Sequence, residues 1–208
     1  MDKYQPDESV ENDPLEAYCV RCRVMVEIQN PEPVWTRRSM PATRGECPIC
    51  QGTVFRMGPT SLHDEKNRPA AVTVADENKR KRPKLPQDTV YVLYAEADEI
   101  IAQQLAADLS NAGIATWLHE HHAADVKWAG RVHPALKECQ RMVIVWSPAA
   151  QADAQLAKDW LFFREQRKPV ILALMDGANP PDELRRSARF DFARDYKRAF
   201  REMMQALG

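Results

Sequence analysis

The sequence lacks the features that would place it in a membrane, secreted or strongly charged class. Its 208 residues contain no apolar run approaching the roughly 20 residues that span a bilayer. The first fourteen residues are polar and acidic, unlike a secretory signal. The formal net charge of -1 argues against a global polyanion-binding field. We therefore expect a cytoplasmic protein with no membrane partner, whose five cysteines are thiols rather than disulfides.

Several nucleotide-binding and catalytic motifs are missing as well. The first long apolar run, at 89–94, is not followed by the glycine pattern of a dinucleotide-binding turn, and no Walker loop occurs. The apolar run at 141–146 ends without the aspartate that a response-regulator receiver domain would need there. No serine occupies a nucleophile elbow. These absences argue against a Rossmann site, a Walker site, a phospho-receiver and an α/β-hydrolase.

Composition divides the chain into four segments. Residues 1–16 are acidic and poor in apolar groups, which predicts a disordered tail. Residues 17–58 carry four of the five cysteines between short β-like runs. Residues 59–87 are polar and proline-containing, which predicts a flexible linker. Its basic run KRKRPK, at 79–84, either contacts nucleic acid or an acidic partner, or only keeps the tether soluble.

The cysteines of the second segment form two CxxC pairs, Cys19 with Cys22 and Cys47 with Cys50. A two-residue spacer lets both thiolates of a pair face one point, and four such sulfurs suit tetrahedral Zn²⁺. A redox dithiol is the alternative, but it normally opens a helix in a larger fold. The segment 17–58 is too short to build a sufficient hydrophobic core alone. We therefore expect structural zinc to be required for its folding. The segment resembles a short zinc-ribbon family, with Gln51 where that family usually has glycine.

Residues 88–208 alternate apolar runs with helical patterns. Strands are predicted at 89–94, 114–118, 141–146, 169–174 and 189–192. Helices are predicted at 98–113, 128–139, 147–167 and 196–207. This alternation predicts an α/β domain with a mostly parallel five-stranded sheet, wrapped by helices on both faces.

Four stretches of this region, taken in order, resemble motifs of a Toll/interleukin-1 receptor (TIR) domain. VYVLYAEAD at 90–98 resembles its first strand, and GIATWLHE at 113–120 resembles its second. Residues 128–148 resemble the following helix and third strand, and DWLFFREQRKPVILAL at 159–174 resembles the next helix and fourth strand. The resemblance covers 88–208 and implies a flavodoxin-like fold.

The TIR resemblance implies two activities. TIR domains associate with one another, largely through the loop after the second strand, which here contains His119, His121, His122, Val126 and Lys127. Many also cleave NAD⁺ at the nicotinamide–ribose bond, with an acid just before a helix tryptophan; Asp159 and Trp160 hold these positions here. The substrate pocket would lie beyond the carboxyl ends of the strands. The candidate substrate-binding residues are Tyr94, Ala95, Glu96, Trp128 and Trp160.

The departures from the family pattern fall at the expected catalytic position. Asp159 replaces a glutamate and is one methylene shorter, and Leu93 and Ala95 replace small polar residues. Asp159 is therefore a weakened acid of an NAD⁺ nucleosidase, a remnant in a domain that only assembles, or a solvated helix residue. The clustered histidines are expected to face solvent.

The leading prediction is a signalling or defence module that self-associates through its TIR domain. The zinc ribbon would then serve recognition or tethering, with a TIR-containing or nucleic-acid partner. NAD⁺ hydrolysis is the alternative function. Nucleic-acid binding by the ribbon and the basic linker is the third.

Overall fold

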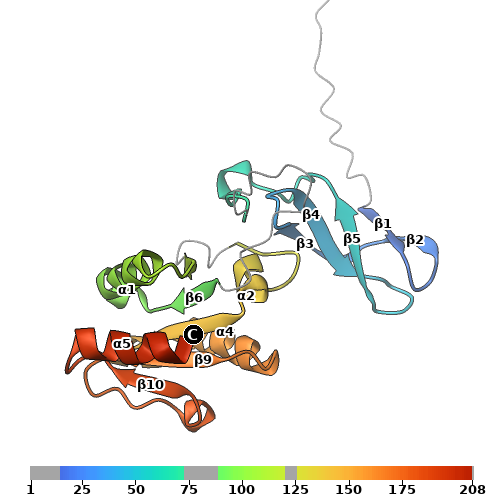
Figure 1. The fold of residues 1–208 in the computed structure, drawn as a ribbon. Helices are drawn as coiled ribbons and strands as arrows, with labels where there is room; N and C mark the ends of the chain where they lie inside the picture. Colours follow the sequence, from blue (N-terminus) through green and yellow to red (C-terminus); the bar gives the residue numbers. More distant parts are fainter. Residues whose placement is uncertain (1–14, 73–88, 120–125, 208) are drawn as a thin grey trace, which may run out of the picture.

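The computed structural model describes residues 15–72, 89–119 and 126–207. They form a small β unit at the N-terminal end and a larger α/β domain, which lie side by side (Figure 1). None of the helices in the described part of the chain has the length and apolar character needed to span a bilayer. Residues 1–14 of the tail predicted at 1–16, the run at 79–84, His121 and His122 lie outside the described residues, whereas Glu16 is the first residue of a strand.

The β unit, called the ribbon below (residues 15–58), contains two small antiparallel sheets. Strands β1 (Glu16–Cys19) and β2 (Val24–Glu27) form a hairpin. Strands β3 (Gln29–Trp35), β4 (Pro41–Glu46) and β5 (Thr53–Met57) form a three-stranded sheet in the order β3-β4-β5. β3 and β4 pair antiparallel and form a hairpin between the two CxxC pairs. The small ribbon core consists of Ala17, Val26, Ile28 and Val54 together with Cys19 and Cys47.

The segment that follows the ribbon differs from the prediction. The sequence places a flexible linker at 59–87, yet residues 59–72 fold back onto the ribbon and include a short helix, η1 (Glu65–Asn67). Ser39 Oγ donates a hydrogen bond to the carbonyl of Pro69 over 2.6 Å, and Val72 N–H donates to Arg37 O over 2.9 Å. A polar composition does not prevent packing here, because side chains such as Ser39 and Arg68 donate hydrogen bonds to backbone carbonyls across the contact.

The α/β domain is built on a five-stranded parallel sheet, as predicted. Its order is β10-β9-β8-β6-β7, and every neighbouring pair is parallel. The strands are β6 (Val90–Leu93), β7 (Thr116–Leu118), β8 (Arg141–Trp146), β9 (Val170–Leu174) and β10 (Ala188–Asp191). Alternate residues of β6 enter two different cores: Val90 and Val92 face one side, and Tyr91 and Leu93 face the other.

Helices cover both faces of this sheet. On one face lie α1 (Glu99–Asn111) and α5 (Tyr196–Leu207), with Leu105, Leu109 and Met203 buried between them and the strands. On the other face lie α2 (Pro134–Glu138), α3 (Pro148–Ala152) and α4 (Ala154–Glu165). Two further short helices are η2 (Glu96–Asp98) and η4 (Asp182–Leu184).

One predicted helix is in fact two. The pattern at 147–167 suggests a continuous helix, but α3 ends at Ala152 and α4 begins at Ala154. Asp153 between them is extended, and its side chain accepts hydrogen bonds from the N–H groups of Gln155 and Leu156. An aspartate that caps a new helix favours such a break. The break sets where α4 starts, and α4 carries Asp159.

Candidate functional site

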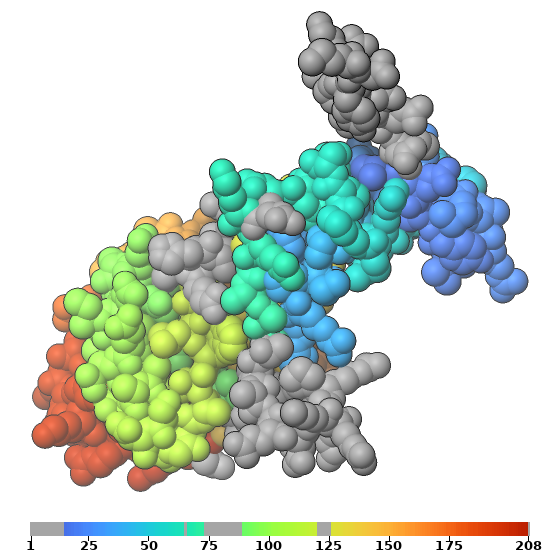
Figure 2. Space-filling view, turned by 90° about the horizontal axis from the view of Figure 1, so that it is seen from above, coloured from blue at the N-terminus to red at the C-terminus, as the bar shows by residue number. Residues whose placement is uncertain are grey.

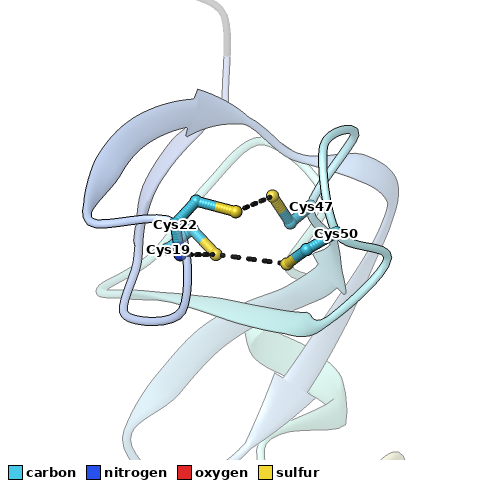
Figure 3. A group of neighbouring side chains, drawn as sticks. All are labelled: Cys19, Cys22, Cys47 and Cys50. Atoms are coloured by element: carbon cyan, nitrogen blue, oxygen red, sulfur yellow. Dashed lines mark hydrogen bonds between the residues drawn. The ribbon is translucent and has the colours of Figure 1, made fainter.

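The four ribbon cysteines converge on one point (Figure 3), as their spacing predicts. Their sulfurs all lie within 4.8 Å of one another. Cys19 Sγ lies 3.6 Å from Cys50 Sγ, and Cys22 Sγ lies 3.9 Å from Cys47 Sγ. A tetrahedron with Zn–S bonds of about 2.3 Å has edges of about 3.8 Å. The donor set and its spacing therefore fit a metal ion of the size and preference of Zn²⁺.

The local backbone turns both CxxC pairs inward, and the pKa values of Cys19 and Cys22 shift in opposite directions. The N–H of Cys22 lies 3.4 Å from Cys19 Sγ and lowers the pKa of that thiol to about 7. Hydrogen bonding with Cys50 raises the pKa of Cys22 to about 12. Arg23 and Gln51, each directly after a CxxC pair, adopt left-handed conformations with φ of 60° and 56°. Gln51 therefore takes the glycine-like turn itself, and the cysteine cluster is retained.

Asp159 lines a pocket on the face of the sheet covered by α2 and α4. The pocket has a volume of about 190 Å³. Tyr91 from β6, His119 just after β7, and Gln155 and Lys158 from α4 line it. The segment before α2 supplies the rest of the wall: Val126, Trp128, Arg131, Val132 and His133. The end of a parallel strand, a loop and a helix start thus enclose one carboxylate, the arrangement expected of an α/β ligand site.

The Asp159 carboxylate is sheltered rather than solvated. Its side chain is only 14% exposed, and Oδ2 lies 3.7 Å from Nδ1 of His119. Burial, with repulsion from Asp153, raises the pKa of Asp159 to about 6, although Lys158 partly opposes this. The side chain therefore has the environment of a functional carboxyl group, in which low solvation favours the neutral form. The reading of Asp159 as a solvated helix residue does not agree with this burial.

His119 connects the carboxylate to the sheet. Its side chain is 12% exposed, so it does not face solvent as the sequence suggested. His119 Nδ1 lies 3.0 Å from the hydroxyl of Tyr91, and the His119 N–H donates to Val92 O over 2.9 Å. These bonds fix the ring beside Asp159, and a protonated imidazole at this distance would favour the ionised carboxylate.

His133 places a buried donor in the pocket wall. Its Nδ1 accepts a hydrogen bond from Ala135 N–H over 3.2 Å, so a neutral ring carries its proton on Nε2. Burial lowers the pKa of His133 to about 4, so the ring is neutral at pH 7. Nε2 is buried and has no hydrogen-bond partner among the described residues. The ring packs edge-to-face against Trp128, with centroids 5.1 Å apart.

The other candidate substrate-binding residues lie in different surroundings. Trp128 lines the pocket. Trp160, on α4, is buried in the core on the side of the helix that faces the sheet. Tyr94 is buried on the opposite face of the sheet, with its ring 6.4 Å from that of His119. Ala95 is buried before η2, and Glu96 is exposed. Of the expected assembly loop, Val126 lines the pocket and Lys127 is exposed.

Six of the pocket residues were not among those predicted from the sequence. They are Tyr91, Arg131, Val132, His133, Gln155 and Lys158. The alternation along β6 could have indicated Tyr91, because it shares the face of Leu93 and not that of Tyr94. The helix predicted at 128–139 begins only at Pro134, so the sequence pattern gave no guide to how Arg131 and His133 are placed.

The aromatic and basic ribbon residues are partly used within the chain. Trp35 is buried against the α/β domain, Arg37 pairs with Glu138, and Arg44 pairs with Glu32 over 2.6 Å. Phe55 is 42% exposed and does not belong to the ribbon core. The described residues thus add no support for a nucleic-acid partner.

Comparisons with known proteins agree with this architecture. Residues 90–204 match the family model described as TIR domain, and the chain belongs to this family. Residues 18–57 match a model described as Domain of unknown function (DUF5679). No curated protein matches the chain. Among solved structures, the TIR domain of the Toll-related Receptor TRR-2 from Hydra magnipapillata is 20% identical, covering 59% of this chain and 98% of that chain, with a TM-score of 0.48.

Proposed function

We propose that this TIR domain binds NAD⁺ and cleaves its nicotinamide–ribose bond, with Asp159 as the stabilising carboxylate. Membership of the TIR family implies a signalling or defence role, and cleavage would be the chemical output of that role. The observation that carries the proposal is the sheltered Asp159 side chain, which is 14% exposed in a pocket with His119, Tyr91 and Trp128. A remnant carboxylate would have no evident reason to stay buried at a cost in solvation.

The reaction needs one well-placed negative charge. When the glycosidic C–N bond breaks, its electron pair moves to the ring nitrogen and neutral nicotinamide leaves. The ribose is left with oxocarbenium-like positive charge, which a fixed carboxylate stabilises. Water then adds to the anomeric carbon and loses a proton, giving ADP-ribose. A burial-raised pKa of about 6 leaves Asp159 mostly ionised at pH 7.5, the form this step requires.

The pocket residues offer partners for the rest of the substrate. Its volume of about 190 Å³ is below the roughly 300–1,000 Å³ of sites that enclose drug-sized ligands, so it would enclose only the nicotinamide riboside end. Arg131 and Lys158 at the rim supply positive charge for the pyrophosphate. The Nε2–H of His133 is a buried donor suited to a carbonyl or hydroxyl oxygen.

A direct assay tests the proposal. Concentrated full-length protein is incubated with NAD⁺ at pH 7.5, and nicotinamide release is measured beside Asp159→Asn and Glu165→Gln. Glu165 is an exposed acid on the same helix and serves as the matched control. We expect Asp159→Asn to lower the turnover by at least about 10²-fold, the scale of a lost charge-stabilising group, while Glu165→Gln stays within twofold. Equal release by the wild type and Asp159→Asn would refute the role of Asp159.

Self-association is the second candidate function. On the described TIR surface, Ile100 on α1 is 87% exposed, which makes it a suitable position for a charge substitution that tests self-association. Lys127 of the expected assembly loop, by contrast, lies against the ribbon, with its Nζ 3.5 Å from Glu32. We expect light scattering to show concentration-dependent oligomers that Ile100→Glu weakens. Scattering that stays monomeric at high concentration would contradict assembly without affecting the catalytic proposal.

We also propose that the cysteine cluster holds a structural zinc ion. Cys19, Cys22, Cys47 and Cys50 would bind it, and the ion would supply folding free energy to a unit with a very small core.

A further inference from the structure

The ribbon contacts the wall of the Asp159 pocket directly. In Figure 1 the β3–β4 end of the ribbon lies next to α2, and in Figure 2 the ribbon extends from one side of the α/β domain, with β1 and β2 (blue) farthest away. Trp35, the last residue of β3, forms a parallel β-bridge with Trp128. The contact thus involves the same residue that lines the pocket.

Two main-chain hydrogen bonds make this bridge. The Trp35 N–H donates to Lys127 O over 2.8 Å, and the Ala129 N–H donates to Trp35 O over 2.8 Å. These Trp35 groups are available because β3 is an edge strand, and because the Trp35–Pro41 pair is one of the alternate pairs of the β3–β4 ladder whose N–H and C=O groups point away from the partner strand. Trp35 is therefore hydrogen-bonded to the residues on both sides of Trp128, Lys127 and Ala129, in the segment before α2.

Side chains secure the same contact. Trp35 and Trp128 are 7% and 6% exposed and belong to one apolar cluster, with Val72 and residues of α2 and α4. Arg37 forms an ion pair with Glu138 at the end of α2, and its Nε donates to Val72 O over 3.0 Å. One face of Trp128 is thus fixed by the ribbon, while another lines the pocket that contains Asp159.

The cysteine cluster is mechanically linked to this contact. Cys47 directly follows β4. β4 pairs with β3 from Gln29 opposite Glu46 to Trp35 opposite Pro41, with a register shift between Gln29 and Glu32. A Cβ added at Gly45 would lie 2.1 Å from Cγ2 of Ile28 and 2.5 Å from Gln29 O, so the strands meet closely beside the cluster. If the cysteine cluster unfolds, the pairing of β4 with β3 would therefore be weakened, and Trp35 at the end of β3 would lose its fixed position.

We infer that the ribbon is a structural part of the candidate site, and that Trp35 is a positioning residue that holds Trp128 in the pocket wall. The inference that Trp128 contacts a ligand rests on the proposed NAD⁺ cleavage. The ribbon would then govern how well the pocket binds, in addition to any external partner it has. Without a folded ribbon, segment 126–133 would lose its hydrogen bonds to Trp35 and the pocket would lose one wall.

A charge-swap experiment in the full chain tests this. Arg37→Glu should place like charges opposite Glu138 and loosen the contact, and adding Glu138→Arg should restore the ion pair. Arg198→Glu, which breaks an exposed pair with Glu202 on α5, is the matched control. Amide hydrogen exchange of residues 127–132 should be about tenfold faster in Arg37→Glu and in the ribbon-disrupting variant Cys47→Ser, and near the wild-type rate in the double swap and the control.

Activity gives a separate readout. Arg37→Glu should raise the KM for NAD⁺ about tenfold with a smaller change in kcat, because it displaces a binding wall and leaves Asp159 in place. Unchanged exchange at 127–132 in both Arg37→Glu and Cys47→Ser would overturn the inference. A wild-type chain that releases no nicotinamide would instead remove the proposed function, and the exchange measurement would still decide whether the ribbon orders this segment.

Discussion

Replacing Asp159 with asparagine should stabilise the fold while it removes the charge. The pKa of Asp159 rises from 3.8 to about 6, mainly because burial removes water from the carboxylate. One pKa unit is about 1.4 kcal/mol, so ionisation disfavours the folded state by about 3 kcal/mol relative to the protonated side chain. Asparagine keeps the shape and is neutral. At pH 7.5 we therefore expect Asp159→Asn to raise the free energy of unfolding by up to about 3 kcal/mol.

The pH dependence of this gain has a definite sign. Because the folded-state pKa is raised, the folded state holds the proton more tightly, and stability from this group is full below about pH 4 and is lost as the pH rises through about 6. The advantage of asparagine should thus be greatest above pH 7 and fall to about half at pH 5. Urea unfolding of the wild type and the variant at pH 5 and pH 7.5 measures it.

Glu165→Gln again provides the control, since this exposed acid on α4 should change stability by less than about 0.5 kcal/mol at either pH. If Asp159→Asn destabilises the protein at pH 7.5, or shifts its stability equally at both pH values, the burial argument for Asp159 is wrong.

Three further predictions concern the two sites. Gln51→Gly should stabilise the metal-loaded ribbon by about 0.5–1 kcal/mol, because Gln51 holds φ at 56°, where glycine is unstrained; thermal unfolding measures this, and a loss of stability would contradict it. Elemental analysis should find one zinc per chain, lost in Cys47→Ser, and a chelator should unfold the ribbon; a ribbon that keeps its fold without metal would exclude a structural role. Asp159→Glu should restore the family's side-chain length and raise nicotinamide release by up to about 10²-fold; an equal or lower rate would show a pocket fitted to aspartate.

Periodicity and cysteine spacing were enough to predict the architecture. The apolar runs gave all five strands of the sheet, and the helix predicted at 196–207 has those bounds in the structure. Within each CxxC pair, the two-residue spacer constrains both thiols locally. The pairs themselves meet across 25 and 31 positions, and the shared ligand chemistry of four cysteines is what predicts that meeting.

The pocket itself depends on contacts that are distant in sequence. Tyr91 and His119 meet across 28 positions, and nothing near either residue indicates the other. The prediction that the histidines face solvent failed for His119 for this reason: a loop composition suggests exposure, while its hydrogen bonds to Tyr91 and Val92 draw it inward. The break at Asp153 was equally hidden, because the apolar spacing continues across it and only the capping geometry separates α3 from α4.

The ribbon and the TIR domain are not two independent units joined by a linker. Trp35 and Val72, which precede the predicted domain boundary, belong to the apolar cluster that holds Trp128, Trp160 and Phe163. A cluster shared in this way links the stability of the two units, since exposing Trp35 would also expose Trp128. Metal binding at the cysteines would then stabilise the TIR pocket as well as the ribbon. The cysteine cluster is thus connected to the pocket of Asp159 through the pairing of β4 with β3 and the bridge between Trp35 and Trp128.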